Sequence, residues 1–231
     1  MKHLLLALFL TLAALPGPAA AQGQFCKLAL ALGLDISSSV NAAEYRLQLE
    51  GLASALETNE VIEAILLPHG AHIQVAVYEW SGYQQQDIII GWTKLDSPER
   101  VRDFAARLRS HRRLYAEFAT ALGKGVEFGA RLFSSAPPCG RKVLDISGDG
   151  ANNDGVGPDY FRERGLLDGI VINGLVILGA VPDPALYYRR HVMQGPESFV
   201  ALARSFEDYK DVMVGKLLRE INTEMILGLA R

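Results

Sequence analysis

An almost unbroken apolar run over Leu28–Leu34 constrains the fold more than any other feature of the chain. A strand without polar alternation is expected where a sheet is covered on both of its faces. The segments Val143–Ser147 and Ile170–Leu178 are also largely apolar, and helical patterns lie between these strands. Strands that alternate with helices imply a mostly parallel, doubly wound central sheet with helices on both faces. The sequence therefore predicts an α/β fold.

Helical spacing of apolar residues predicts several helices, and local start signals place two of them. Asn41 can cap a helix, and Glu44 stands where it completes a capping box. Ser97 is a good cap, and Pro98 suits the first helical position. Further helices are expected at about 60–66, 120–133, 159–167 and 206–218. Two strands that form a hairpin are expected at 73–80 and 87–92, and a last short strand at 199–203.

The N-terminus has the layout of a secretory signal peptide. Lys2 gives a positive start, residues 4–15 are apolar, and Ala19, Ala20 and Ala21 supply the small residues of a cleavage site. We expect cleavage after Ala21, with an uncleaved N-terminal anchor as the alternative. The predicted organisation is a signal peptide over residues 1–21 and a single domain over residues 22–231, in the periplasm or outside the cell.

The composition is that of a globular protein, with 49% hydrophobic and 21% charged residues in a chain of 231. The formal net charge is −3, and neither a basic stripe nor a basic repeat is present. No nucleic-acid partner is therefore expected. After the signal peptide, no stretch is long and apolar enough to predict a membrane span.

Most of the candidate functional residues lie where predicted strands end, and one lies at the start of a predicted helix. Asp35, Ser37 and Ser39 are spaced by two directly after the first strand, and only a turn could direct all three into one space. Asp149 stands between two glycines after another buried strand, and Thr120 opens a predicted helix. In sheets of this kind, ligands bind beyond the carboxyl ends of the strands, where the strand order reverses. The sequence therefore predicts one site formed by these side chains.

Carboxylates and hydroxyls are hard oxygen ligands, which suit Mg²⁺, Mn²⁺ or Ca²⁺ better than a thiophilic metal. Mg²⁺ is the cation that we expect first. A site with few protein charges also implies bound water and an open position for an external ligand. The alternative is that these aspartates and serines only cap helices and shape turns, as they commonly do.

The two loops and the threonine resemble the von Willebrand factor type A family. The segment 35–39 matches the D-x-S-x-S motif of that family, and Val143–Gly150 resembles its fourth strand and aspartate loop. The segment 120–123 resembles its threonine loop. Together they resemble a metal-ion-dependent adhesion site, and the resemblance extends over nearly all of the chain after the signal peptide. A bacterial branch of exported type A domains is the nearest match.

The resemblance implies a role for each site residue. Ser37 and Ser39 would bind the metal directly, and Thr120 would do so in one state of the site. Asp35 and Asp149 would act mainly through bound water. A carboxylate of a protein partner would complete the coordination.

The chain departs from the family pattern at two places near these loops. Phe118 and Ala119 precede Thr120 where glycines are usual. Gly148 stands before the aspartate where many members have threonine.

Cys26 and Cys139 are the two cysteines of the chain. An even count in an exported chain suggests one disulfide, with two separate thiols as the alternative. The family resemblance favours the bond, because it makes the strands that follow the two cysteines parallel neighbours at the centre of the sheet. Neighbouring strands are about 4.8 Å apart, which suits the Cα spacing of a disulfide.

Two classes of function fit the candidate site. The first is a protein–protein interaction module of the adhesion type, in which the metal captures an acidic group of a partner. The second is a metal-dependent hydrolase, which needs a general base or an activated nucleophile near the metal. The sequence has neither a G-x-S-x-G elbow nor an H-E-x-x-H motif, so binding is favoured over catalysis. A structural domain with an empty site is a third possibility.

Three other patterns have plainer interpretations. The segment Asp149–Gly155 lacks the ligand spacing of an EF-hand loop and is predicted to be a turn. Gly123, Gly125 and Gly129 lack the spacing of a dinucleotide loop and are expected to permit close helix packing. Asp145 lies within a predicted strand and is interpreted as a satisfied buried acid outside the site.

Overall fold

The computed structural model describes residues 25–228 and confirms the predicted α/β fold. The sheet has six strands in the order β3-β2-β1-β4-β5-β6. Neighbouring strands are parallel except β2 and β3, which form the predicted antiparallel hairpin. The strands are β1 (Phe25–Asp35), β2 (Ala71–Trp80), β3 (Gln86–Leu95), β4 (Arg141–Gly148), β5 (Val171–Ile177) and β6 (Val200–Ala203). The predicted signal peptide lies outside the described residues.

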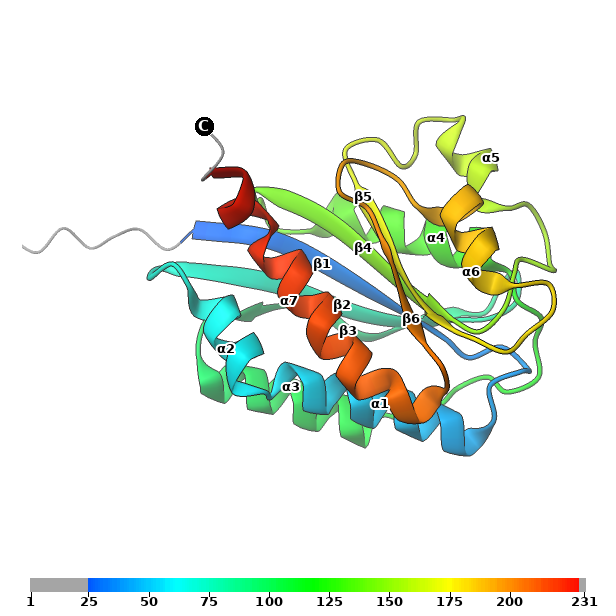
Figure 1. The fold of residues 1–231 in the computed structure, drawn as a ribbon, viewed down its shortest axis with the longest axis horizontal. Helices are drawn as coiled ribbons and strands as arrows, with labels where there is room; N and C mark the ends of the chain where they lie inside the picture. The colour runs from blue at the N-terminus through cyan, green and yellow to red at the C-terminus, as the bar shows by residue number, and fades with distance from the viewer. Residues whose placement is uncertain (1–24, 229–231) are drawn as a thin grey trace, which may run out of the picture.

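Helices cover both faces of the sheet (Figure 1), and each face packs its own apolar core against them. One face carries α1 (Ala42–Leu56), α2 (Asn59–Leu66), α3 (Pro98–Ser110) and α7 (Tyr209–Gly228). The opposite face carries α4 (Leu122–Leu132), α5 (Pro158–Arg162) and α6 (Pro184–Tyr187). Within residues 25–228, none of the helices combines the length and the apolar character that a membrane span needs.

The strand β1 runs through the centre of the sheet, from the disulfide at its amino end to the first candidate loop at its carboxyl end. Leu30 and its neighbour Ala31 belong to opposite cores, as expected for a strand that is buried on both faces. At the amino end of β1, Cys26 forms a disulfide with Cys139, which lies just before β4, and their Cα atoms are 4.6 Å apart. The pairing of β1 with β4 confirms that these strands are parallel neighbours. At its carboxyl end, β1 leads into the first candidate loop.

Start signals in the sequence place two helices correctly. Asn41 caps α1 by accepting hydrogen bonds from backbone N–H groups, and the side chain of Glu44 accepts a bond from the backbone N–H of Asn41. Ser97 caps α3, and Pro98 occupies its first turn. Because α1 begins a few residues after β1, its amino end faces the edge of the sheet where the candidate loops lie.

The prediction of a helix over 159–167 is wrong in length. The helix α5 is shorter because the chain then turns through Gly165 and Gly169, whose positive φ values interrupt a right-handed helix. The sequence analysis also missed α6 and the π-helical turn Tyr188–Val192 that follows it. Asp183 caps α6 directly before a proline, which is the same signal that marked the start of α3.

Two other helices begin later than predicted. The helix α4 starts after Thr120, because the backbone N–H and carbonyl of Thr120 are both hydrogen-bonded to Asn153. The predicted helix over 206–218 begins with the 3₁₀ turn Phe206–Asp208 and continues as α7. A further 3₁₀ turn, Phe133–Ser135, ends α4.

Candidate metal centre

The first candidate loop leaves the carboxyl end of β1 and turns sharply. The backbone N–H of Ser37 donates a hydrogen bond of 2.7 Å to Oδ1 of Asp35, and the hydroxyl oxygens of Ser37 and Ser39 lie 3.2 Å apart. Asp35 and Ser37 are buried, whereas Ser39 is exposed. The loop therefore presents oxygen atoms from the core of the protein out to its surface.

The second candidate loop follows β4 and meets the first at the same edge of the sheet. Ser39 donates a hydrogen bond of 2.8 Å to Oδ1 of Asp149, although the two residues are 110 positions apart. The strands β1 and β4 are the parallel neighbours on either side of the point where the strand order reverses. The structure thus brings Ser37, Ser39 and Asp149 into one continuous row of polar contacts.

Thr120 lies in the same hollow as Ser39 and Asp149. Its Oγ1 is 3.6 Å from the position that a Cβ on Gly150 would take. Asn153 holds the backbone of Thr120, since its Oδ1 accepts a bond of 2.8 Å from the Thr120 N–H and its own N–H donates to the Thr120 carbonyl. The hollow has a volume of about 240 Å³ and is lined by residues 38, 39, 120, 149–153 and 180–182.

Burial and like charge raise the pKa of both carboxyl groups. Burial raises the pKa of Asp35 to about 7, and the negative charge of Asp149 adds to this shift. Burial also raises the pKa of Asp149, with a contribution from the charge of Glu44. Oδ2 of Asp35 is buried without a hydrogen-bond partner. A buried carboxylate oxygen without a donor is costly, so this pair of carboxyls favours a proton or a cation beside it.

The available donors fit a hard cation, because they are hydroxyl and carboxylate oxygens. Within residues 25–228, no group of three or more histidine, cysteine, aspartate or glutamate side chains is arranged to hold a metal ion. A metal at this edge would therefore depend on hydroxyl ligands as well as on the two carboxyls. Such a ligand set leaves positions for water or for an external anion.

Sequence reasoning missed Arg113, whose side chain is hydrogen-bonded to the backbone of the first loop. Its guanidinium donates hydrogen bonds of 2.5, 3.0 and 2.7 Å to the carbonyl oxygens of Ile36, Ser37 and Val40. The backbone N–H of Ser38 donates a further bond of 2.8 Å to a carbonyl oxygen in the segment that follows Arg113. No local pattern marks Arg113, because its partners lie 73 to 77 positions earlier in the chain.

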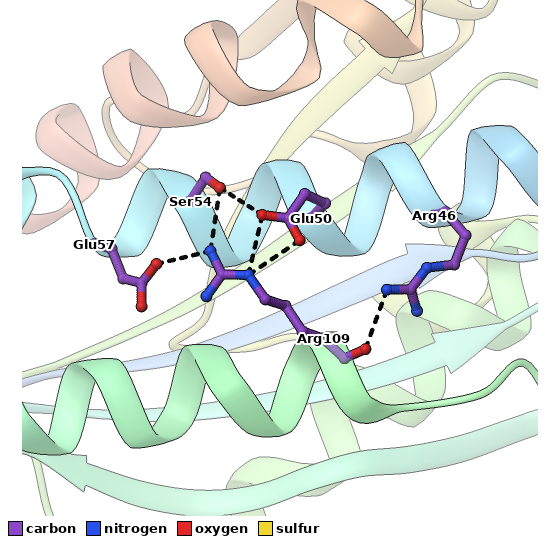
Figure 2. A network of polar contacts seen from close by, with 5 residues as sticks. All are labelled: Arg46, Glu50, Ser54, Glu57 and Arg109. Atoms are coloured by element: carbon purple, nitrogen blue, oxygen red, sulfur yellow. Dashed lines mark hydrogen bonds and ion pairs between the residues drawn. The ribbon is translucent and has the colours of Figure 1, made fainter.

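An ion-pair network between α1 and α3 fixes the start of that segment (Figure 2). Arg109 of α3 forms ion pairs with Glu50 of α1 and with Glu57, the residue that follows α1, with nitrogen–oxygen distances of 3.0 and 2.7 Å. Arg46 of α1 donates a bond of 3.1 Å to the carbonyl oxygen of Arg109. The end of α3 is thereby held against α1, and the segment that carries Arg113 departs from this end.

Gly148 departs from the family pattern for a steric reason. A Cβ on Gly148 would lie 2.6 Å from the hydroxyl oxygen of Tyr188 and 2.9 Å from Oδ2 of Asp35, closer than Cβ contacts in real proteins. A threonine at this position therefore has no room. Tyr188 is fully buried and belongs to the π-helical turn that the sequence analysis missed.

Asp145 is a buried acid outside the candidate site, as predicted, but it is satisfied only by an ion pair, since neither of its carboxyl oxygens has a hydrogen-bond partner among the described residues. Its Oδ1 lies 3.0 Å from Nζ of Lys216 on α7, and Lys216 also lies 2.6 Å from Glu220. Asn173 donates a bond of 2.7 Å to Glu220. These four buried side chains join β4 and β5 to α7, so their role is in packing this helix on the sheet.

Comparison with known proteins assigns the family. Residues 25–225 match the family described as "Protein of unknown function (DUF1194)". The chain belongs to this family. No curated protein matches this DUF1194 chain.

Solved structures share the fold of this DUF1194 chain. Proximal thread matrix protein 1 from the mussel byssus has a TM-score of 0.64 at 16% identity, over 84% of this chain and 49% of that one. The same mussel protein with a zinc-occupied MIDAS motif has a TM-score of 0.60 at 14% identity, over 85% and 48%. MIDAS denotes the metal-ion-dependent adhesion site. The PilB minor pilin from Streptococcus sanguinis has a TM-score of 0.62 at 15% identity, over 88% and 63%.

A von Willebrand factor type A protein from Catenulispora acidiphila is similar as well, with a TM-score of 0.60 at 14% identity over 85% of this chain and 43% of that one. The DUF1194 chain thus spans about half the length of most of these proteins. At such identities the likeness concerns the fold, which is von Willebrand factor type A-like, as the sequence resemblance implied.

Proposed function

We propose that the protein is an exported interaction module that binds a divalent cation and captures an acidic group of a protein partner through it. The observation that carries this proposal is the row of oxygens from Ser37 through Ser39 to Asp149, which crosses two loops. Behind this row, the buried Oδ2 of Asp35 has no partner. Such an arrangement supports a role in holding a positive charge.

The role that we propose for each residue at the cation follows the family resemblance. Ser37 and Ser39 hold the cation directly, Thr120 joins them in one state of the site, and Asp35 and Asp149 act mainly through water. Bound there, the cation supplies positive charge at the open edge of the sheet. Mg²⁺ is the proposed ion, with Mn²⁺ or Ca²⁺ as alternatives. The zinc-occupied MIDAS of the mussel protein supports including Zn²⁺ in the tests.

Capture of a carboxylate is favoured over hydrolysis. Of the described residues that line the hollow, Asp149 alone has a carboxyl or imidazole group, and this aspartate already accepts the hydrogen bond from Ser39. A hydrolase needs a free general base beside the metal. Export is supported by the signal-peptide layout and by the disulfide, because disulfides persist in oxidising compartments.

Calorimetric titration of the mature chain tests the metal site. Mg²⁺, Mn²⁺, Ca²⁺ and Zn²⁺ are titrated into the wild type and into the Asp35→Ala, Ser37→Ala and Ser134→Ala variants. We expect the first two substitutions to abolish binding, whereas Ser134→Ala, the control at an exposed serine that does not line the hollow, retains it. Circular dichroism checks that each variant is folded. Wild-type affinity in both Asp35→Ala and Ser37→Ala would show that the assigned site is wrong.

A second titration tests the ligand class. A peptide that carries one aspartate is compared with the same peptide carrying asparagine, with Mg²⁺ present and after addition of EDTA. We expect binding only with the aspartate peptide and only with Mg²⁺. Turnover of an ester or phosphoester that depends on Asp149 would instead favour the hydrolase.

A further inference from the structure

A second hollow, larger than the one at the metal site, lies between α4 and α5, with a volume of about 670 Å³. We call it the α4–α5 groove. Half of the residues that line it are cationic side chains and tyrosines: Tyr83, Lys124, Arg131, Tyr160 and Arg164. Apolar side chains from the core under α4, α5 and α6 form part of its lining. The groove therefore combines positive charge with apolar surface.

The charge in the groove runs against the balance of the whole chain, which has a formal net charge of −3. Of the described residues that line the groove, Glu127 alone is acidic, and it is buried between Lys124 and Arg131. Arg131 and Arg164 are exposed. Asp154 and Asp168 lie beside the groove, next to Tyr83 and Gly165 of its lining. Within the lining itself, one carboxylate stands against three cations, and this local excess of positive charge attracts anionic ligands.

Two of these cations are already held in place. The guanidinium carbon of Arg164 lies 3.5 Å from the ring centroid of Tyr160, and Arg164 donates a bond of 2.9 Å to the Tyr160 carbonyl. Nζ of Lys124 lies 4.8 Å from the ring centroid of Tyr83. A stacked guanidinium loses little freedom when it binds a carboxylate with two hydrogen bonds. Because the protein's own cations lie over these rings, carboxylates are favoured over sugars that stack on aromatic faces.

We propose that the α4–α5 groove is a second binding site, for an acidic peptide segment of a partner protein. Carboxylates of the segment pair with Arg164 and its neighbouring cations. Apolar side chains between them pack on the buried floor, to which Phe161 contributes.

The groove and the candidate metal centre share one wall, the loop that follows β4. Oδ1 of Asn152 accepts a bond of 3.0 Å from the N–H of Gly123 in α4, and Oδ2 of Asp154 accepts a bond of 3.0 Å from the N–H of Tyr83. Residues 149–153 of this loop line the metal hollow, and Val156 farther along the loop lines the groove. That a single partner occupies both sites rests on the proposed function. The charge complementarity of the groove is independent of it.

Fluorescence anisotropy in the presence of EDTA tests the groove alone. The probe is a fluorescein-labelled peptide of alternating glutamate and leucine, compared with the same peptide carrying lysine in place of glutamate. The variants are Arg164→Glu and Arg164→Gln. The matched control is Arg107→Glu, an exposed arginine of α3 on the opposite face of the sheet. Titrations at low and high salt report the electrostatic contribution.

We expect the acidic peptide to bind in EDTA, with affinity about tenfold weaker in Arg164→Glu, intermediate in Arg164→Gln and unchanged in Arg107→Glu. If Arg164→Glu fails to fold, Arg164→Gln decides. Alginate, an anionic polysaccharide, is added as a competitor in the same assay. Equal affinity in all variants, equal binding of the lysine peptide, or tighter binding of alginate than of the acidic peptide would overturn the proposal. So would loss of peptide binding in EDTA, since the peptide would then occupy the metal site. A failure of Mg²⁺ binding in calorimetry removes only the proposed metal function.

Discussion

At the scale of a single residue, the charge of Asp35 connects the stability of the fold with the proposed metal site. Burial raises the pKa of its carboxyl to about 7, whereas an aspartate in an unfolded chain titrates near pH 4. Between these values the folded protein binds the proton more tightly than the unfolded chain does. The contribution of Asp35 to stability is therefore full below about pH 4 and is lost as the pH rises towards 7.

The Asp35→Asn variant should gain stability at the same time as it loses metal binding. Without divalent cations, we expect it to unfold at a higher temperature than the wild type at pH 8, because position 35 then carries no buried charge. At pH 5 the difference should shrink, since the wild-type carboxyl is then protonated. Thermal unfolding in EDTA at both pH values, with calorimetry of Mg²⁺ binding, measures both effects.

The exposed Asp103 of α3 provides the control, because Asp103→Asn removes a carboxyl that water already solvates. Its melting temperature should change equally little at both pH values. An Asp35→Asn variant that is less stable than the wild type at pH 8 without cations would contradict this account of the site.

At the scale of elements, the segment between α3 and α4 supports the first candidate loop through Arg113. We expect Arg113→Ala to weaken Mg²⁺ binding about tenfold, because three loop carbonyls lose their shared donor. Arg113→Lys should recover only part of the affinity, since an ammonium lacks the planar fork of a guanidinium. Calorimetry measures the affinity, and the melting temperature checks the fold.

Arg112 is the matched control for this experiment, because it is the exposed neighbour in the same segment. Arg112→Ala should bind Mg²⁺ like the wild type. If Arg112→Ala and Arg113→Ala reduce the affinity equally, the loop is not held by Arg113 and only the general charge of the segment matters.

The helix α4 packs so closely on the sheet that two of its glycines, Gly125 and Gly129, have no room for side chains. A Cβ on Gly129 would lie 2.4 Å from the Tyr78 hydroxyl and 2.5 Å from Cδ1 of Leu144. Gly129→Ala should therefore cost about 1–3 kcal/mol of stability in chemical denaturation. Gly215 of α7 is exposed, and a Cβ there would meet no atom within 4 Å, so Gly215→Ala should stabilise by about 0.5–1 kcal/mol. The same sign for both changes would refute the packing argument.

What the sequence predicts well are features whose cause is local. The strand β1 followed from its apolar run, and the start of α1 from the Asn41 capping box. The assignment of the α4 glycines to close packing is also confirmed, although their contacts are with residues distant in sequence. The early end of α5 was missed because the conformations of Gly165 and Gly169 depend on the turn as a whole.

The candidate site was predicted only in part for a related reason. Asp35, Ser37, Ser39 and Asp149 could be found because strand ends in a parallel sheet share an edge. Arg113 and Tyr188 could not, since they reach the site from distant segments and belong to no recognisable spacing. The interpretation of these residues as metal ligands stays a prediction until a cation is measured at the site.

At the scale of the whole molecule, the disulfide and the candidate metal centre lie at opposite ends of β1. Removing the bond by Cys26→Ser and Cys139→Ser should lower stability by up to about 4–5 kcal/mol, because the bond closes a loop with a sequence separation of 113. Mg²⁺ affinity should be unchanged, since the cysteines do not approach the site. Chemical denaturation measures the stability and calorimetry the Mg²⁺ affinity of the same samples. If the affinity falls together with the stability, the two ends of the sheet are coupled.

The position of the disulfide also determines how the protein would respond to a pull on its two chain ends. Asp35, Ser37, Ser39 and Thr120 lie inside the covalent loop, and Asp149 lies outside it. Tension applied at the ends bypasses the loop and passes directly from Cys26 to Cys139. The extension of the oxidised chain should therefore be shorter than that of the reduced chain by about 400 Å, the contour length of such a loop. The three hydroxyl residues of the candidate site would thus be shielded from mechanical load, whereas Asp149 would carry it.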